Sequence, residues 1–180
     1  MTHDLRILVP EDAIRTRVAA LAAELATVLN GVSPLVVGLL DGAFVFTADL
    51  VRELARRQVP ARVTFMSLAS YGRSTRSRGT VTVIRDCAPD EVRQRTVLLV
   101  DDILDSGATL QFAHARLIAF GAARVITCVL LDKPSRRRVS FTPDFIGFTI
   151  PDAFAVGYGL DHAGEYRGLP WVATLPEGTP

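Results

Sequence analysis

The chain has few cysteines, no long apolar run and almost no net charge. Its two cysteines, Cys87 and Cys128, lack the spacing of a metal site. No segment approaches the roughly 20 apolar residues of a membrane span, and Met1–Pro10 has no apolar core like that of a signal peptide. These absences predict a protein of the reducing cytoplasm with no membrane partner.

The charge balance and the missing motifs exclude further classes. Twenty basic residues face 19 acidic ones, so the net charge of +1 gives no basic surface for a nucleic-acid partner. A hydrophobic content of 49% excludes a disordered chain. No Gly-x-Gly-x-x-Gly follows a predicted strand and no Gly-Lys-Ser/Thr is present, which disfavours a Rossmann dehydrogenase and a P-loop enzyme.

What the chain does contain is an alternation of helical and strand patterns. The first half predicts a helix over Pro10–Leu29, a strand over Leu35–Leu40, a helix over Phe44–Arg57, and strands over Val63–Leu68 and Thr80–Arg85. The second half predicts a strand over Val97–Val100, a helix from Leu110 to near Gly121, and a strand over Arg124–Leu131. At 180 residues this alternation predicts one α/β domain with a central parallel sheet flanked by helices.

The most informative stretch is Val97–Leu110, which reads VLLVDDILDSGATL. Four apolar residues, two of them β-branched, form the short unbroken run of a strand that is buried on both faces of a parallel sheet. Two adjacent carboxylates, Asp101 and Asp102, follow this run, and Asp105 comes three residues later. The small polar turn Ser106-Gly107-Ala108-Thr109 then leads into the predicted helix.

Each part of this stretch has a chemical interpretation. Ligands of open parallel sheets bind at the carboxyl ends of the strands, which is where the acids are expected. The free N–H groups of a helix N-terminus favour a phosphate; Gly107 allows a close backbone approach, and the hydroxyls of Ser106 and Thr109 add hydrogen bonds. Since carboxylates repel phosphate, Asp101 and Asp102 are expected to contact sugar hydroxyls and a hydrated magnesium ion. The alternative is a plain strand–turn–helix with solvated acids.

Other segments also carry side chains suited to chemistry. The polar, basic segment Ala69–Thr80 is either a plain connection or a lid over an anionic ligand. Lys133 follows the last predicted strand and is either a solvated lysine or part of a site. The basic run at 136–138 is interpreted as a solvated face. The aromatic and glycine-rich segment 143–161 suits a small hood, in which an aromatic ring can stack on a flat base.

The motif Asp-Asp-x-x-Asp-Ser-Gly-x-Thr after an apolar strand closely resembles the phosphoribosyl-diphosphate (PRPP) signature of the type I phosphoribosyltransferases. Asp105 before Ser106-Gly107 is similar to the hypoxanthine/guanine branch, since the orotate and adenine enzymes and the pyrimidine-operon regulators usually have a non-acidic residue there. Segment 143–161 resembles the same branch in the pattern Pro-Asp-Phe-x-Gly-Phe-x-Ile-Pro-Asp-x-Phe-x-Val-Gly-Tyr-x-Leu-Asp. The resemblance covers most of the chain from Leu35 to Leu175.

The resemblance implies the type I phosphoribosyltransferase fold, as a single domain over residues 1–180. Its core is expected over about 30–135, its hood from the N-terminal residues and about 136–180, and a flexible lid loop over 69–80 that contains Ser70 and Tyr71. The implied ligands are PRPP, a purine base and the nucleotide product, with Mg²⁺ as the cofactor. A homodimer or homotetramer is implied as well, and the apolar helix start Phe44-Val45-Phe46 is a candidate interface.

The resemblance also implies a role for each matching residue. Asp105 faces purine N7 as the catalytic carboxylate, Lys133 hydrogen-bonds the 6-oxo group, Phe154 stacks on the purine, and the backbone at Ala155 meets the edge bearing the 2-substituent. The matches to the PRPP and phosphate site are Asp101, Asp102, Ser106, Gly107, Ala108, Thr109, Asp41, Gly42 and Arg167. The matches to the magnesium site are Asp101, Asp102 and Asp161. The implied reaction is attack of purine N9 on C1 of PRPP, with release of pyrophosphate.

Two positions depart from the pattern of the relatives. Ala108 replaces a longer residue seen in some of them, and little effect is expected because the turn uses backbone N–H groups there. The loop after the first strand usually reads Leu-Lys-Gly or Leu-Arg-Gly, whereas this chain has Leu40-Asp41-Gly42. That loop binds pyrophosphate, so a contact through the acidic side chain is not expected, although backbone contacts remain available. Two alternatives stay open: an RNA-binding regulator of nucleotide synthesis, which the near-neutral charge disfavours, and a paralogue with weak activity or a different base.

Overall fold

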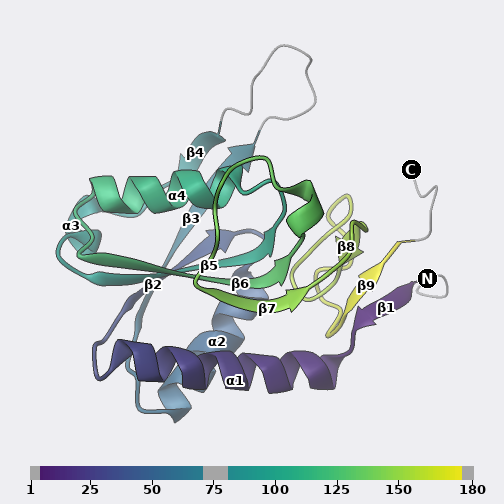
Figure 1. Cartoon of the computed structure of the whole chain (residues 1–180), viewed down its shortest axis with the longest axis horizontal. Coiled ribbons are helices and arrows are strands. Elements are labelled where there is room, and N and C mark those ends of the chain that lie inside the picture. Colours follow the sequence, from purple (N-terminus) through teal and green to yellow (C-terminus); the bar gives the residue numbers. More distant parts are fainter. Residues whose placement is uncertain (1–4, 71–80, 176–180) are drawn as a thin grey trace.

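The structure is a computed structural model that describes residues 5–70 and 81–175 (Figure 1). The helices of these residues are α1 (Glu11–Leu29), α2 (Phe44–Arg56), α3 (Pro89–Val92) and α4 (Ala108–Ala119), with a 3-10 turn, η1, at Pro134–Arg136. The strands are β1 (Arg6–Val9), β2 (Leu35–Leu40), β3 (Arg62–Ser70), β4 (Val81–Arg85), β5 (Thr96–Leu104), β6 (Arg124–Asp132), β7 (Phe145–Thr149), β8 (Ala155–Val156) and β9 (Val172–Thr174).

The larger sheet has six strands in the order β4-β3-β2-β5-β6-β7. Neighbouring strands run parallel throughout, except that β4 is antiparallel to β3. Helices α1 and α2 cover one face, and α3 and α4 lie on the other (Figure 1). The predicted α/β fold with a mainly parallel central sheet is therefore confirmed, and the parallel strands bring their carboxyl ends to one edge.

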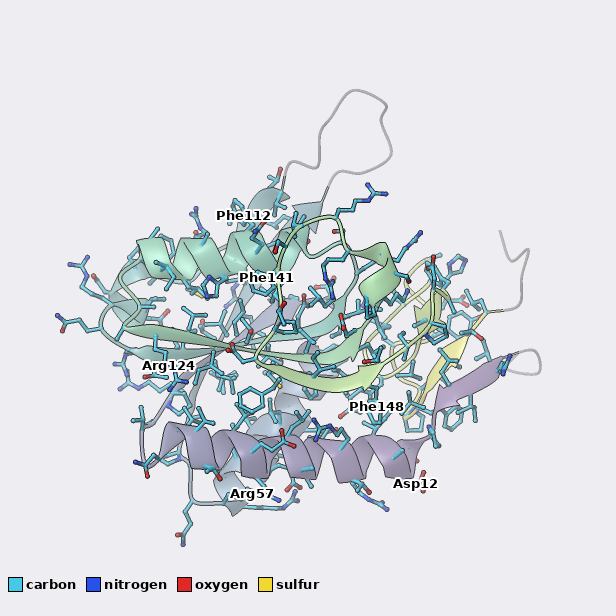
Figure 2. The ribbon with its side chains drawn as sticks, viewed as in Figure 1. Asp12, Arg57, Phe112, Arg124, Phe141 and Phe148 are labelled. Carbon is cyan, nitrogen blue, oxygen red and sulfur yellow. The ribbon has the colours of Figure 1, made fainter. Side chains whose placement is uncertain are left out.

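The central strand β5 separates two hydrophobic cores. Leu98 packs in the core that contains α1 and α2, whereas the next residue, Leu99, packs in the core that contains α4. Both side chains are fully buried, as the unbroken apolar run predicted. Figure 2 shows the side chains of the two layers, with Phe148 on the α1 side of the sheet and Phe141 on the α4 side.

The central stretch differs from the prediction at both of its boundaries. β5 does not end before the acid pair but continues through it to Leu104, because β6 pairs with it as far as that residue. α4 begins at Ala108 rather than at Leu110, and Gly107, which has a left-handed conformation, is the residue before it. The two acids therefore lie within the sheet and not in a loop beyond it.

The segment expected wholly in the hood contributes a strand to the larger sheet. β7 lies beside β6 as its sixth, edge strand. Phe145 and Phe148 pack on the α1 side of the sheet, which supplies the reason for the pairing. Arg17 in α1 donates hydrogen bonds to the carbonyls of Ile146 (2.7 Å) and Gly147 (3.1 Å), so α1 holds this edge of the sheet.

The smaller sheet has the order β1-β9-β8 and is antiparallel, so it joins the first and last described strands. Val172 of β9 and Ala155 of β8 belong to the same hydrophobic core as α1 and α2. The Tyr158 hydroxyl donates a hydrogen bond of 2.6 Å to Asp49 of α2. The smaller sheet is therefore fixed to the larger one by packing and by this hydrogen bond.

The apolar start of α2 is divided between core and surface. Phe46 is fully buried in the core and Val45 is partly buried, so neither forms the exposed interface suggested by the sequence. Only Phe44 remains substantially accessible, with 42% of its surface exposed. Of the three residues in this run, only Phe44 can therefore contribute a large exposed surface to an interface.

The two strands that flank the expected lid form an antiparallel ribbon, as predicted, in which Ser70 pairs with Val81. Tyr71 and the rest of the expected loop to residue 80 lie outside the described residues. Within the described part of the chain, no helix has both the length and the apolar character needed to cross a membrane.

Candidate active site

A cleft of about 620 Å³ opens at the carboxyl edge of the larger sheet. Its walls are the turn that follows β2, the carboxyl ends of β3 and β5, and the turns that follow β5 and β6. Residues 152–155, 160 and 161 and Arg167 complete them. The predicted site residues that line it are Asp41, Gly42, Asp102, Asp105, Lys133, Phe154, Ala155, Asp161 and Arg167. Residues that are far apart in the sequence therefore meet in one cavity, as the strand order requires.

A second hollow of about 270 Å³ adjoins the cleft, since Asp102 and Asp105 line both. The other predicted residues in its wall are Asp101, Ser106, Gly107 and Thr109. Ala108 is the first residue of α4 beside it. The small polar turn and the acids thus surround one space, rather than projecting separately into solvent.

The turn has the geometry of an anion site. Gly107 has a φ of 85°, a conformation that side chains with a Cβ rarely adopt, and an added Cβ would lie 2.9 Å from Val139. No side chain caps the N-terminus of α4, and the Ala108 N–H reaches the Ser106 hydroxyl only at 3.4 Å. The N–H groups of the first helical turn are therefore available to a phosphate.

The acid pair is buried, and this has an electrostatic cost. Asp101 is only 8% exposed, and its carboxylate accepts the backbone N–H of Asp102 at 3.0 Å. Burial raises the pKa of Asp101 well above that of an ordinary aspartate and raises the pKa of Asp102 as well. Hydroxyl donors or a cation would relieve this cost. Among the described residues, no three His, Cys, Asp or Glu side chains form a complete metal cage.

The turn after β2 packs directly against the acid pair. A Cβ on Gly42 would lie 1.7 Å from the Asp102 carboxylate, and one on Gly159 would lie 2.0 Å from the Gly42 carbonyl oxygen. The peptide bond between Leu40 and Asp41 is cis. Only a residue without a side chain fits between the acid pair and residue 159, so Gly42 is required by close approach.

Arg167 lies among three acids on the same side of the cleft. Its guanidinium is 2.9 Å from the Asp161 carboxylate and 3.9 Å from that of Asp41, and it donates to the Gly159 carbonyl at 2.7 Å. Its charge also opposes the rise in the pKa of Asp102. The Asp41 side chain is 73% exposed, so it lies at the rim of the cleft.

The opposite side of the cleft can hold a flat polar ring. Lys133 is 5% exposed, and burial lowers the pKa of its ammonium group, although the Asp105 carboxylate opposes that shift. Phe154 is 56% exposed and meets the His162 ring edge to face at 5.4 Å between centroids. Ala155 begins β8, so its backbone is fixed by pairing with Thr174.

The interpretation of the basic run as a solvated face is wrong for Arg137. Its side chain is 17% exposed, donates to the carbonyls of Leu104 (3.0 Å) and Asp105 (2.6 Å), and pairs with Asp132. Asp132 directly follows the buried apolar run Cys128–Leu131 of β6, and a buried acid requires a partner. In the sequence, Asp132 was the residue that could have predicted a buried arginine nearby.

The predicted lid residues are Ser70 and Tyr71. The backbone of Ser70 ends β3, and Tyr71 lies outside the described residues.

Comparison with known proteins agrees with this geometry. The family described as Phosphoribosyl transferase domain matches residues 8–163. The chain is 42% identical over 177 residues to the hypoxanthine-guanine phosphoribosyltransferase of Bacillus subtilis (strain 168), covering 97% of this chain and 96% of that protein. It is 46% identical over 170 residues to the protein of the same name from Aquifex aeolicus (strain VF5), covering 93% of each. A solved ternary substrates complex of a mutant Trypanosoma cruzi hypoxanthine phosphoribosyltransferase has a TM-score of 0.90 at 37% identity, covering 98% of each chain.

The structural role of Arg137 can be tested by replacing it with methionine. Arg137→Met leaves the buried carboxylate of Asp132 without a partner, so we expect the free energy of unfolding to fall by about 3–5 kcal/mol. Urea unfolding followed by circular dichroism measures this change. A double variant that adds Asp132→Leu should recover much of the loss, because no charge is then left unpaired. A loss below about 1 kcal/mol in Arg137→Met would contradict the role.

Proposed function

Because the chain belongs to the phosphoribosyl transferase domain family, in its hypoxanthine-guanine branch, we propose that it is a purine-salvage enzyme acting on a 6-oxopurine. It transfers the 5-phosphoribosyl group of PRPP to N9 of hypoxanthine or guanine and releases pyrophosphate. The observation that carries this proposal is the meeting of an uncapped helix start, a buried acid pair and a buried lysine at adjoining cavities. Both cysteines are buried free thiols, which supports a cytoplasmic location.

The two sheets are proposed to work as a single domain. One hydrophobic core includes α1, α2, three strands of the larger sheet and residues of the smaller sheet. Residues of the smaller sheet also line the cleft, because Phe154 and Ala155 come from its entry. A shared core and a shared cavity support one unit in which the smaller sheet closes the base side.

PRPP is proposed to bind with its 5-phosphate at the turn from Ser106 to Thr109. The N–H groups at the start of α4 and the two hydroxyls of the turn suit a phosphate. Asp101 and Asp102 then face the ribose hydroxyls, whose donors relieve the cost of burying two adjacent carboxylates. The backbone of the Asp41-Gly42 turn and the guanidinium of Arg167 are on the side proposed for pyrophosphate.

The purine is proposed to bind between Phe154 and the carboxyl ends of β5 and β6. Lys133 donates to the 6-oxo group, and the backbone at Ala155 meets the edge that carries the 2-substituent. A 6-amino group would place one donor against another and leave the buried ammonium unpaired, which is heavily penalised. This arrangement supports selection of hypoxanthine and guanine over adenine.

Catalysis follows from position and charge. N9 attacks C1 of PRPP while the bond from C1 to the pyrophosphate oxygen breaks, with positive charge developing on the ribose ring. Asp105 accepts the N7 proton as the bond from N9 to C1 forms, which raises the nucleophilicity of N9 and leaves the product base neutral. Arg167 stabilises the negative charge of the departing pyrophosphate.

Mg²⁺ is proposed as the cofactor, with Asp101, Asp102 and Asp161 as its candidate carboxylate ligands and PRPP completing its shell. Magnesium in proteins usually takes one or two carboxylates and completes its shell with water and phosphate oxygens. A site with buried acids but without a complete protein cage fits such an ion. When bound, it would supply positive charge to the diphosphate of PRPP.

Nucleotide formation from purified protein tests the proposed function. The protein is incubated with PRPP and MgCl₂ and with hypoxanthine, guanine, xanthine or adenine in turn, and the products are separated by chromatography. We expect nucleotide from a 6-oxopurine, at least roughly 10²-fold lower kcat/KM with adenine, and loss of turnover with EDTA. PRPP-dependent turnover with none of the four bases would overturn the proposal, and an RNA gel shift would then test the regulator alternative.

Replacing Asp105 tests its proposed place at N7. Asp105→Asn removes the charge that holds the proton but keeps a similar shape, so we expect kcat to fall by about 10²–10⁴-fold. The affinity for PRPP, measured by calorimetry with Mg²⁺ present, should change little because the turn at 106–109 is intact. A variant with nearly normal turnover would remove Asp105 from the mechanism.

The acidic residue at the cleft rim should weaken pyrophosphate binding. Asp41 places a negative charge 3.9 Å from the guanidinium of Arg167. Asp41→Asn should therefore lower the KM for pyrophosphate in the reverse reaction by about two- to fivefold, since an exposed charge is worth roughly 0–1 kcal/mol. Asp90→Asn removes an even more exposed charge on α3, away from the cleft, and is the control for net charge. Equal effects of the two variants would show that only net charge matters.

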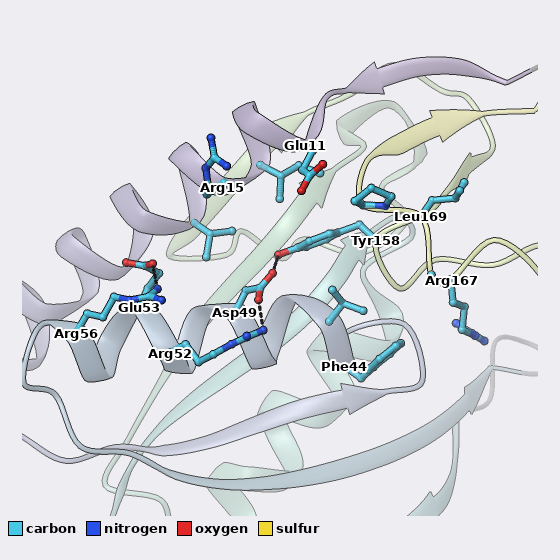
Figure 3. Close-up of a pocket in the computed structure, with 15 residues that line it drawn as sticks. Glu11, Arg15, Phe44, Asp49, Arg52, Glu53, Arg56, Tyr158, Arg167 and Leu169 are labelled. Carbon is cyan, nitrogen blue, oxygen red and sulfur yellow. Dashed lines mark hydrogen bonds and ion pairs between the residues drawn. The ribbon is translucent and has the colours of Figure 1, made fainter. Parts of the chain in front are cut away.

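A homodimer is proposed through the face formed by α1, α2 and residues 158–170. This face holds a cavity of about 570 Å³ (Figure 3). Its lining contains the exposed ring of Phe44 and equal numbers of basic and acidic side chains on the two helices, namely Arg15, Arg52, Arg56, Glu11, Asp49 and Glu53. Such a mixed patch can pair with its own copy about a twofold axis.

The dimer can be tested with a charge on this face. Phe44→Lys should shift the sedimentation coefficient at micromolar concentration toward that of a monomer, because it buries a charge at the proposed contact. Ile118→Lys, an exposed apolar position on α4 across the sheet, is the matched control and should leave the assembly unchanged. A wild-type protein that sediments as a monomer would overturn this part of the proposal.

A further inference from the structure

Arg136 connects two walls of the cleft through a pair of carboxylates. Its Nε lies 3.4 Å from Asp105 in the turn after β5 and 3.3 Å from Asp152 in the segment after β7. All three residues line the same cleft as Lys133 and Phe154. One side chain thus joins the carboxylate proposed to face N7 to the segment that carries the stacking ring.

Two cations and two carboxylates lie at this bridge. Lys133 and Arg136 face Asp105 and Asp152, and each of these charges affects the ionisation of the lysine. In the described part of the chain, no ion pair within 4 Å joins the Lys133 ammonium to a carboxylate, although Asp105 is the attractive charge with the largest influence on it. The guanidinium is therefore the cation that contacts Asp105, and the ammonium remains unpaired for a ligand.

Resting on the proposed function, we propose that Arg136 is a positioning residue that holds Asp105 toward the purine and keeps it from pairing with Lys133. With Arg136 in place, one carboxylate oxygen of Asp105 faces the guanidinium and the other is available for the N7 proton. Without it, the flexible ammonium of Lys133 can swing onto Asp105, and both groups are then lost to the base.

The exposure of the three side chains argues against a role in stability alone. Arg136, Asp105 and Asp152 are each about half exposed, and exposed pairs of this kind contribute little to folding. A bound base would exclude water from the cleft and strengthen the same contacts. The ion pairs of Arg136 are therefore strongest when the purine is bound. Their loss should lower catalysis without lowering the free energy of unfolding.

Four variants test the proposal through kcat and the KM values of hypoxanthine and PRPP. Arg136→Ala should lower kcat/KM for hypoxanthine by about tenfold or more while leaving the KM for PRPP and the Tm nearly unchanged. Arg136→Lys should recover part of the loss, since it keeps the charge without the planar fork. Asp152→Asn should give a smaller loss of the same kind. Arg138→Ala, which removes an exposed neighbouring arginine, is the matched control and should behave as wild type.

The decisive measurement repeats Arg136→Ala in the Asp105→Asn background. If Arg136 acts through Asp105, its replacement should lower kcat/KM little further in that background. The losses of the two single variants should then be far from additive. Full additivity, or a wild-type kcat/KM in Arg136→Ala, would overturn the proposal while leaving the enzyme assignment intact. A wild-type protein without PRPP-dependent turnover would instead overturn the proposed function and this inference together.

Discussion

The cleft depends on the burial of two adjacent carboxylates inside the central strand. β5 carries Asp101 and Asp102 into the sheet because its hydrophobic residues fill cores on both faces and β6 pairs with it beyond the acids. The free energy gained by burying Leu98 and Leu99 offsets the free-energy cost of burying the two carboxylates. The carboxylates are consequently fixed in position before any ligand arrives, which is the preorganisation that transition-state stabilisation requires.

The surrounding turns are held by contacts to this strand rather than by their own local structure. Gly42 packs directly on Asp102, and Arg137 fastens the turn after β6 to the carbonyls at the end of β5. A residue with a side chain at position 42, or a shorter one at 137, would separate segments that have to act together. Supporting contacts of this kind hold functional side chains within the small tolerances that chemistry needs.

The sequence predicted the fold class, most helices and strands, and many of the residues that line the cleft, because apolar periodicity and strand-end chemistry are local signals. It missed the strand identity of Phe145–Thr149 and the buried role of Arg137, because both depend on partners distant in the chain, namely β6 and Asp132. The bridge from Arg136 to Asp105 and Asp152 was equally invisible, since three separate segments create it. The structural roles of these residues depend on long-range contacts, which cannot be read from a window of neighbouring residues.

The order of the smaller sheet has a consequence for how the chain is made. β9 is its middle strand, so β1 and β8 have no partner until residues 172–174 have left the ribosome. The larger sheet, whose strands are all complete by Thr149, can assemble earlier in translation. The turns proposed for the sugar phosphate can therefore form first in the nascent protein, and the wall proposed for the base is among the last parts to form.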